Sequence, residues 1–229
     1  MRLIAAMTTG LLTAAWSLSS VAANWVEGQH YFRIQPAQAT SVAPGKVEVA
    51  EAFSYGCPAC NAFLPIMEDI KKQLPPQAQI VLVHASFNTA EQWPMFQRAF
   101  YTAQQLGIAD KTHEAMFGAV WDRGELAVTD ASGRIKKPAP TIEDAAKWYA
   151  KTAGVASGKF LEASQSFSVD SNIRRAEAWM KGCRIDQTPT IVINGKYRLH
   201  VRSAGGVKEM VELIDWLVMK ESAATSAAR

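Results

Sequence analysis

Residues 46–60 read KVEVAEAFSYGCPAC, and this stretch decides how the rest of the chain is interpreted. Its first half, residues 46–53, has the apolar pattern of a largely buried strand. Glu51 is the polar member of an otherwise apolar face of that strand. A helix is predicted to begin at Cys57, because Pro58 suits the first helical position, where its missing N–H has no intrahelical partner. The stretch therefore predicts a strand, a tight turn and a helix that starts at a cysteine.

The sequence that follows completes a strand–helix–strand unit. The predicted helix ends at Pro75 and Pro76, and residues 79–84 (QIVLVH) form a continuous apolar strand. Two parallel strands need a covering crossover of this kind. Later in the chain, residues 190–199 (TIVINGKYRL) contain Asn-Gly between two apolar runs, which is a strong hairpin signal.

Between these two sheet-forming regions the strand signals disappear and helical periodicity takes over. A last helix is predicted over residues 206–220. The five predicted helices between the sheet regions span residues 93–106, 110–121, 141–151, 157–165 and 171–181. We therefore expect an α/β fold in which an α-helical subdomain, residues 89–183, is inserted into a sheet domain made of 24–88 and 184–221. Residues 222–229 are predicted to form a disordered tail.

The N-terminal segment is interpreted as a signal peptide covering residues 1–23. Arg2 precedes an uncharged, mostly apolar run, and Val21-Ala22-Ala23 provides the small residues that a signal peptidase recognises. The alternative is a membrane anchor, but the run is short for a bilayer of about 30 Å. Cleavage is the favoured reading, and it implies export to an oxidising compartment.

Composition excludes several other classes of protein. Of the 229 residues 48% are hydrophobic and 20% are charged, and the net charge is +3. This is the profile of a folded globular chain and not of a disordered one. The basic clusters are too short to follow a phosphate backbone, so a nucleic-acid partner is not expected.

The chemistry is predicted to lie at two of the three cysteines, Cys57 and Cys60. Residues three apart in a first helical turn are close enough for a disulfide that can open and close. Cys57 is predicted to be the N-cap, where free backbone N–H groups and the helix dipole favour a thiolate. Cys60 lies one turn further in and is less accessible, so Cys57 is the sulfur that a partner thiol attacks.

A Cys-x-x-Cys motif alone also occurs in haem and zinc sites. Haem attachment requires His after the second cysteine, where this chain has Asn61. Zinc requires two more ligands, which Cys183 and one of the four histidines could supply, although no second close pair exists. A purely structural disulfide would close too small a loop to constrain the unfolded chain much. Redox chemistry without a metal or cofactor is therefore favoured over these alternatives.

Three motifs together resemble the DsbA family of periplasmic thiol:disulfide oxidoreductases. They are FSYGCPAC at 53–60, Thr-Pro-Thr at 188–190 and Asn-Gly-Lys-Tyr at 194–197. The resemblance implies a thioredoxin-like fold with a helical insertion, in which residues 24–88 and 184–221 form the thioredoxin-like domain. It also implies that Cys57 is the reactive cysteine and Cys60 the resolving one. DsbA is itself an established example of a low-pKa cysteine in an oxidising couple, so that tuning comes with the resemblance.

The resemblance assigns roles to three further residues. Pro189 is expected to be a cis-proline facing the cysteines, although an X-Pro bond alone favours trans. Together with Thr188 it would offer main-chain groups to an extended substrate. Glu51 is expected to be a buried acid that exchanges protons with Cys60; the alternative is an edge position that reaches water, because Glu is rarely buried unpaired.

The chain departs from the family's pattern at two positions. Ala59 lies between the cysteines, where the best-known members carry His. The strand 79–84 contains no Lys to accompany Glu51, and Leu82 occupies the expected place. His84 is interpreted as a core histidine without a catalytic role, and Cys183 as a buried, inert thiol. The alternative for Cys183 is a regulatory thiol or a third partner for the Cys57–Cys60 pair.

The function expected from this resemblance is oxidation of newly exported proteins. Reduced, unfolded clients would take up the Cys57–Cys60 disulfide, and a DsbB-like membrane quinone reductase would restore it. We expect a monomer in the periplasm of a Gram-negative bacterium. The alternatives are a disulfide isomerase or reductase and a non-enzymatic peptide-binding or metal module. Isomerases of this type have a separate N-terminal domain, for which too few residues precede residue 46.

Overall fold

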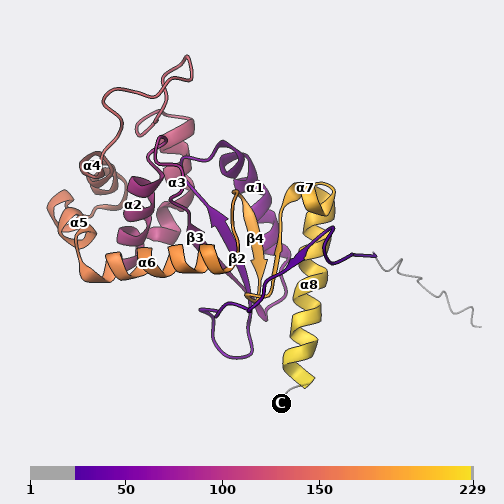
Figure 1. The fold of residues 1–229 in the computed structure, drawn as a ribbon. Helices are drawn as coiled ribbons and strands as arrows, with labels where there is room; N and C mark the ends of the chain where they lie inside the picture. The colour runs from indigo at the N-terminus through magenta and orange to yellow at the C-terminus, as the bar shows by residue number, and fades with distance from the viewer. Residues whose placement is uncertain (1–23, 228–229) are drawn as a thin grey trace, which may run out of the picture.

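The computed structural model describes residues 24–227, which form a five-stranded sheet surrounded by helices (Figure 1). The strand order is β1-β5-β4-β2-β3, so β2 lies inside the sheet and β3 at one edge. The predicted signal peptide, residues 1–23, lies outside the described residues. The strands are β1 (Phe32–Arg33), β2 (Val47–Phe53), β3 (Ala78–His84), β4 (Thr190–Ile193) and β5 (Tyr197–Leu199).

The predicted strand–helix–strand unit is confirmed. Strand β2 leads through α1 (Pro58–Gln73) to β3, which pairs with β2 in parallel from Val47↔Ala78 to Phe53↔His84. Every residue of β2 is buried, because the strand has a neighbour on each side and helices on both faces. This arrangement places the N-terminus of α1 directly after the end of a rigid central strand.

The hairpin near the C-terminus is also confirmed. Strands β4 and β5 pair in antiparallel fashion around Asn194 and Gly195, whose φ angles of 53° and 66° suit the predicted turn. A side chain at residue 195 could not be accommodated, because its Cβ would lie 2.0 Å from the Gln38 carbonyl oxygen. The short strand β1, which pairs with β5, was not predicted.

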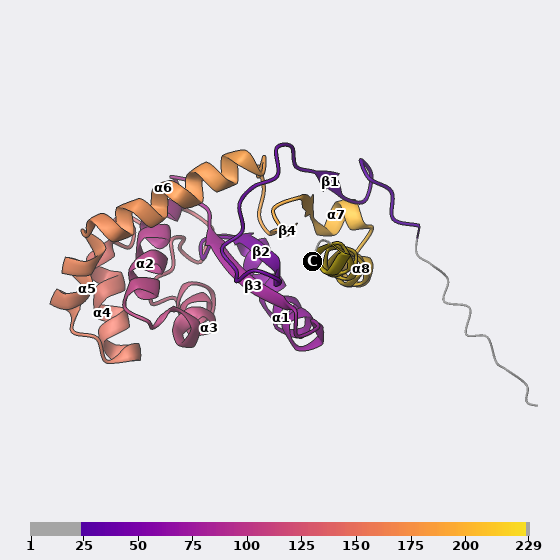
Figure 2. The same cartoon turned by 90° about the horizontal axis from the view of Figure 1, so that it is seen from below.

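Five helices lie between β3 and β4, as the sequence predicts, and gather on one side of the sheet (Figures 1 and 2). Thr141 and Asp144 form a capping box at the start of α4. Helix α6 begins four residues earlier than predicted, because the Ser166 hydroxyl accepts a hydrogen bond from Val169 N–H. The helices are α2 (Trp93–Gln105), α3 (Ala109–Trp121), α4 (Ile142–Ala153), α5 (Ser157–Ser164) and α6 (Phe167–Gly182). The assignment of residues 89–183 as a separate subdomain stays a prediction.

The C-terminal helix is longer than the sequence analysis expected. After the short α7 (Val201–Ala204), α8 runs over Val207–Ala227, so the prediction of a disordered tail is wrong for residues 222–227. Glu221 is buried and accepts hydrogen bonds from Asn194 and Lys196, which ties this part of the helix to the β4–β5 turn. The alanine-rich segment beyond it then continues as helix.

The two faces of the sheet are covered by different helices, as Figure 2 shows. Helices α1 and α8 pack on one face, over apolar side chains of β2 and β4. Helix α6 crosses the other face, where Cys183 packs with Ala50 and Val192. Within residues 24–227, no helix combines the length and the apolar character needed to cross a membrane.

Candidate active site

Cys57 is the N-cap of α1, as predicted. Its backbone is extended, with φ −92° and ψ 116°, and its Sγ accepts a hydrogen bond from Cys60 N–H at 3.2 Å. Pro58 occupies the first turn, and Cys57 N–H donates to Ser54 O. The sulfur therefore lies at the end of the helix where N–H groups converge.

These donors hold the pKa of Cys57 down to about 6. The largest cause is a hydrogen bond from the Cys60 thiol; burial opposes it, and Thr188 and the N–H groups of Cys60 and Ala59 add to the lowering. Cys57 is 4% exposed and also lies 3.5 Å from Thr188 O. At neutral pH a reduced Cys57 is therefore mainly a thiolate, which makes it a good leaving group.

Cys60 has the opposite character. It is 1% exposed, and burial together with the neighbouring Cys57 raises its pKa far above the ordinary value. Both cysteines are free thiols in the structure. Cys60 must take up a proton when it leaves a disulfide, whereas Cys57 can leave as an anion.

The segment before β4 supplies the wall opposite the cysteines. The Thr188–Pro189 peptide bond is cis, and the Thr188 carbonyl is the group that faces Cys57 Sγ. Thr188 Oγ1 is buried and makes no hydrogen bond to another described residue, so it is available to donate to a thiolate. This hydroxyl contribution was not predicted from the sequence, which pointed only to the main chain of Thr188.

Glu51 lies inside the molecule, and the reading of it as a water-reaching edge residue is wrong. It is 4% exposed on the central strand β2, between Leu82 of β3 and Ile191 of β4. As the sequence predicts, the neighbour of Glu51 on β3 is Leu82, so this strand places no cation beside the carboxyl group. Burial, followed by the charges of Cys57 and Glu68, raises the pKa of Glu51 to about 8. A carboxyl group with this pKa is mostly protonated at pH 7.

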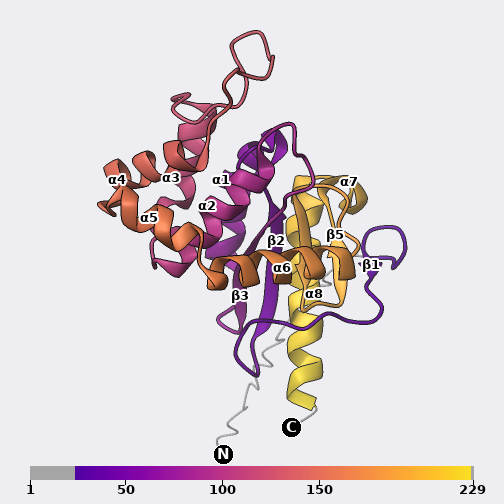
Figure 3. The same ribbon diagram turned by 60° about the vertical axis from the view of Figure 1, so that its left-hand side comes forward.

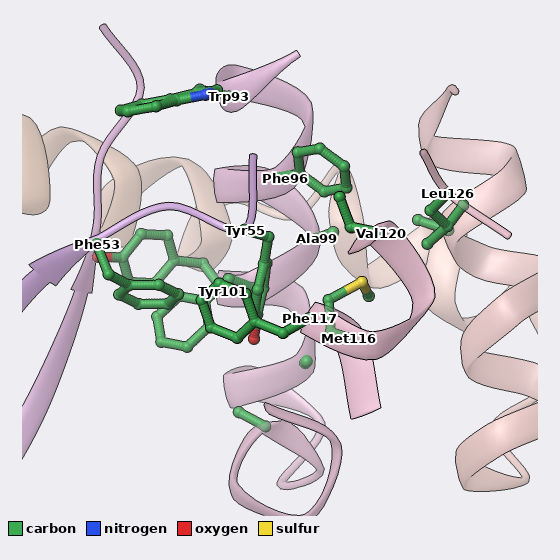
Figure 4. Packing of buried hydrophobic residues seen from close by; sticks show 14 of the residues in the cluster. Phe53, Tyr55, Trp93, Phe96, Ala99, Tyr101, Met116, Phe117, Val120 and Leu126 are labelled. Carbon is green, nitrogen blue, oxygen red and sulfur yellow. The ribbon is translucent and has the colours of Figure 1, made fainter. Parts of the chain in front are cut away.

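The turn that precedes Cys57 is fixed by residues that sequence analysis did not assign to the site. Tyr55 N–H donates to His84 Nε2 at 3.1 Å, and Trp121 Nε1–H donates to Tyr55 O at 2.9 Å. Figure 4 shows the Tyr55 ring packed among Phe96 and Phe117. A Cβ at Gly56 would lie 2.8 Å from the Trp93 ring, so only glycine fits. Side chains of α2 and α3 therefore position the active-site turn.

His84 is fully buried, in agreement with its interpretation as a core histidine. Burial lowers its pKa to about 3, so the ring is neutral and Nε2 can accept the Tyr55 N–H. Its Nδ1 is 2.8 Å from Ala85 O. The imidazole is a structural support for the turn and does not reach the sulfurs in any hydrogen bond among the described residues.

A groove of about 380 Å³ is lined by Thr188 and Pro189, and it lies beside Cys57, because the Thr188 carbonyl oxygen is 3.5 Å from the Cys57 sulfur. Apolar and small side chains of α1, including Ala59, Phe63 and Ile66, also line it. Thr188 and Pro189 line it on one side, and residues 200–202 complete it. An extended chain in this groove would bring its own cysteine to Cys57.

Cys183 lies away from this site. It is fully buried on the face of the sheet that α6 covers. Glu51 shares the opposite face with Val47 and Val49, and Cys57 packs in a separate cluster with side chains of α2 and α3. Burial raises the pKa of Cys183 to about 12. Across residues 24–227, no group of three or more His, Cys, Asp or Glu side chains is placed to hold a metal ion.

Comparisons with known proteins agree with this geometry. A family model described as Thioredoxin matches residues 43–215. The thiol:disulfide interchange protein DsbA of Pseudomonas syringae is 34% identical over 215 residues, which is 93% of each chain. DsbA of Pseudomonas aeruginosa is 30% identical over 213 residues, again 93% of each.

Solved structures give the same picture. The crystal structure of Pseudomonas aeruginosa DsbA matches with a TM-score of 0.75 and 33% identity, covering 90% of this chain and 98% of that one. The oxidoreductase DsbA from Xylella fastidiosa matches with a TM-score of 0.76 and 28% identity, covering 86% and 98%. The similarity in both comparisons extends over the sheet and the helices between its two parts.

Proposed function

This chain belongs to the DsbA family of thioredoxin-like thiol:disulfide oxidoreductases, and on that premise we propose how its residues oxidise client proteins. The observation that carries the proposal is the asymmetry of the pair: the pKa of Cys57 is lowered to about 6, while that of Cys60 is raised. The reduced form of the Cys57–Cys60 couple is thereby favoured over the disulfide, because reduction leaves a stabilised thiolate on Cys57.

In the first step a client thiolate attacks Cys57 Sγ of the Cys57–Cys60 disulfide. The client–Cys57 bond forms, the Cys57–Cys60 bond breaks, and Cys60 leaves with the electron pair. Cys60 then requires a proton, since its pKa is high. Glu51, buried and with a pKa of about 8, is the acid proposed to provide it.

In the second step another client thiolate attacks the client sulfur of the mixed disulfide. A client disulfide forms, and Cys57 leaves as a thiolate. Two client thiols are thus oxidised while the enzyme disulfide is reduced to a dithiol. Thr188 and Pro189 are proposed to hold the client main chain in the groove beside Cys57.

The clients, the reoxidant and the compartment are proposed as well. Reduced, unfolded exported proteins are the proposed clients, and a DsbB-like membrane quinone reductase is the proposed reoxidant. The periplasm is proposed because residues 1–23 have the pattern of a signal peptide. The isomerase and metal-module alternatives are not favoured by the relatives, which are named as DsbA.

The test is a redox equilibrium against glutathione, with reactivation of reduced RNase as the activity assay. The reduction potential of thioredoxin is about −270 mV, and we expect this couple to be far more oxidising than that. Cys57→Ser should abolish reactivation. A potential as low as that of thioredoxin would reject the role as a disulfide donor.

A further inference from the structure

A second groove, of about 530 Å³, lies on the opposite face of the sheet from the groove beside Cys57. Loop residues 38–41, strand β3 and helices α2 and α6 surround it. Figure 3 shows α6 passing in front of the sheet beside β3. Its apolar walls include Val83, Tyr101 and Trp179. Nothing in the redox mechanism uses this groove.

The strand that borders the groove is an unusual edge strand. Strand β3 pairs with β2 on one side and with no other strand among the described residues. Its sequence, AQIVLVH, contains no Lys, Glu, Asp or Pro. Edge strands are normally protected by such residues against pairing with other chains. Residues 80–83 are only half-buried, so an apolar edge remains accessible.

The main chain of this edge has unused hydrogen-bonding groups. In the parallel ladder Ala85 N–H donates to Phe53 O, and the same alternation turns the main-chain groups of Ile80 and Leu82 away from β2. Gln97 of α2 satisfies the His84 carbonyl at 2.8 Å, but no described residue outside the sheet bonds the main chain of Ile80 or Leu82.

Leu82 lines the groove with its main chain and not with its side chain. Its side chain lies on the same strand face as that of Glu51, its partner in register, because neighbouring strands align their side chains. The groove lies on the other face and still includes Leu82 in its lining. Leu82 therefore contributes main-chain atoms, which is the surface that a further strand would use.

The groove also contains a buried carboxylate with spare capacity. Glu48 is 2% exposed, and its Oε2 accepts from Ser41 N–H at 2.6 Å and from Ser41 Oγ–H at 2.8 Å. Its Oε1 accepts no hydrogen bond from the residues that the structure describes. The other charged side chain of the groove, Arg175, donates to Ser171 and Asn172 on its own helix. A cationic side chain entering the groove could therefore donate to Glu48 Oε1 and pair with its charge.

We propose that this groove binds an extended polypeptide segment carrying a Lys or Arg side chain. The segment pairs with the edge of β3 through Ile80 and Leu82, its apolar side chains pack against the groove walls, and its basic side chain reaches Glu48. Such a segment would lie two strand spacings, about 10 Å, from β2. Only a long side chain spans that distance. The identification of the segment as part of a client chain rests on the proposed function; its binding does not.

A second copy of this chain matches the groove less well than a client segment. If β3 paired with β3 of another copy, the incoming strand would be residues 78–84, which contain no Lys or Arg and whose His84 is fully buried. An unfolded client, in contrast, offers many extended segments with basic and apolar residues side by side. Bound here, it would be tethered while its cysteines visit Cys57, which raises their local concentration.

The test uses a fluorescent, cysteine-free peptide, acetyl-Val-Thr-Lys-Thr-Val-Thr-Val-amide, in which Lys and the valines share one strand face, titrated into the full mature protein and into its Cys57→Ser variant. We expect saturable binding of equal affinity in both. Replacing Lys by norleucine should weaken binding about tenfold. N-methylation of alternate main-chain amides should abolish it, since the strand edge can then no longer be paired. Amide NMR signals of residues 80–83 should shift on binding.

The matched variants are Glu48→Gln and, at an exposed acid on α3, Glu114→Gln. Glu48→Gln should weaken the Lys peptide about tenfold and leave the norleucine peptide unchanged, while Glu114→Gln changes neither. Oxidation of dithiothreitol by Glu48→Gln shows that the fold and the active site are intact. If that variant does not fold, the peptide series on the wild-type protein decides alone.

Three outcomes would overturn the proposal. The first is equal affinity for the Lys and norleucine peptides. The second is undiminished binding of the N-methylated peptide, or NMR shifts confined to the groove beside Cys57. The third is a dimer in sedimentation that pairs through β3 and that the peptide does not dissociate. Failure of glutathione titration with intact peptide binding would instead reject the redox function alone.

Discussion

Two buried cysteines at opposite ends of two helices differ in almost everything except burial. Cys57 is the N-cap of α1 and is 4% exposed; Cys183 is the C-cap of α6 and is fully buried. The pKa of Cys57 is lowered to about 6, whereas that of Cys183 is raised to about 12. Burial opposes the thiolate at both positions, so burial does not distinguish them.

What distinguishes them is the set of donors around each sulfur. Cys57 receives a backbone N–H of its own helix, lies beside Cys60 and Thr188, and sits at the positive end of the helix dipole. Cys183 packs against Ile34, Ala50 and Val192 at the negative end, with Glu48 adding an unfavourable charge. The comparison shows that the helix end and its donors, more than accessibility, decide which thiol is reactive.

The largest effect is expected when each of the two thiols is removed in turn and client oxidation is measured. Cys57→Ser should reduce oxidation of reduced RNase by at least about a thousandfold, because it removes the nucleophile's target sulfur. The matched variant Cys183→Ala should retain activity within about twofold, as expected for a structural thiol. A comparable loss in Cys183→Ala, with an unchanged melting temperature, would show that the third thiol takes part in the reaction.

The pH dependence of stability sharpens the same comparison. The pKa of Cys57 falls from 9.0 to about 6 on folding, so its thiolate stabilises the reduced protein fully above pH 9. The contribution decreases as pH falls and is lost at about pH 6. At 1.36 kcal/mol per pKa unit this amounts to about 4 kcal/mol above pH 9 and about 1.4 kcal/mol at pH 7.

Denaturation of the reduced protein and of reduced Cys57→Ala at several pH values measures this contribution as their difference. Reduced Cys183→Ala serves as the control, and its difference from wild type should stay constant between pH 6 and 8, below the pKa of this thiol in either state. A Cys57 difference that does not vary over this range would contradict the assignment of a stabilised thiolate to the helix N-terminus.

The next largest effect is expected at Glu51, the buried acid, and concerns both stability and the rate of client oxidation. The raised pKa of Glu51, from 4.5 to about 8, means that the folded state binds its proton more tightly than the unfolded state does. Its burial therefore costs stability increasingly from pH 4.5 to pH 8, about 3 kcal/mol at pH 7. Glu51→Gln should relieve this cost and slow client oxidation about tenfold.

The kinetic measurement distinguishes a proton donor from a merely structural residue. The rate profile of the wild-type protein should show an inflection near the Glu51 pKa of about 8 that is absent in Glu51→Gln. A variant that keeps the inflection, whatever its stability, would assign the titration to another group. Leu82→Lys, which places a cation beside Glu51 in register, should move the inflection to lower pH.

The smallest expected effect concerns the residue between the cysteines. Ala59 is exposed, so Ala59→His can be accommodated, and its imidazolium would lie beside the Cys57 thiolate. It should lower the Cys57 pKa and make the couple about threefold more oxidising in the glutathione equilibrium. The control is Gln73→His at the other end of α1. An unchanged or raised pKa in thiolate titration by ultraviolet absorbance would reject the prediction.

Local patterns predicted much of this architecture because they encode local physics. Pro58 marks the first turn of α1, Asn194–Gly195 the hairpin, and the apolar run of β3 a parallel partner for β2. The same patterns could not give contacts between distant segments. The bond from Trp121 to the Tyr55 carbonyl joins residues 66 positions apart and has no local signal.

Two features that depend on contacts between distant segments have a common physical origin. The sequence left the burial of Glu51 open, since strand alternation names a face but not the strand's place in the sheet. Only the order β4-β2-β3 shows that the carboxyl group has an apolar neighbour on each side. Likewise the helix beyond Ser222 depends on Glu221 bonding to Asn194 and Lys196, a tertiary contact that composition does not reveal.

The separation of the three thiols by environment has a practical consequence. All three sulfurs are buried, but Cys60 and Cys183 are protonated at neutral pH, whereas Cys57 is ionised at the N-terminus of α1. A maleimide added briefly to the native reduced protein will therefore conjugate at one sulfur. The wild-type chain can be attached to a bead or a dye through its own reaction centre, in a defined orientation and without removal of any cysteine.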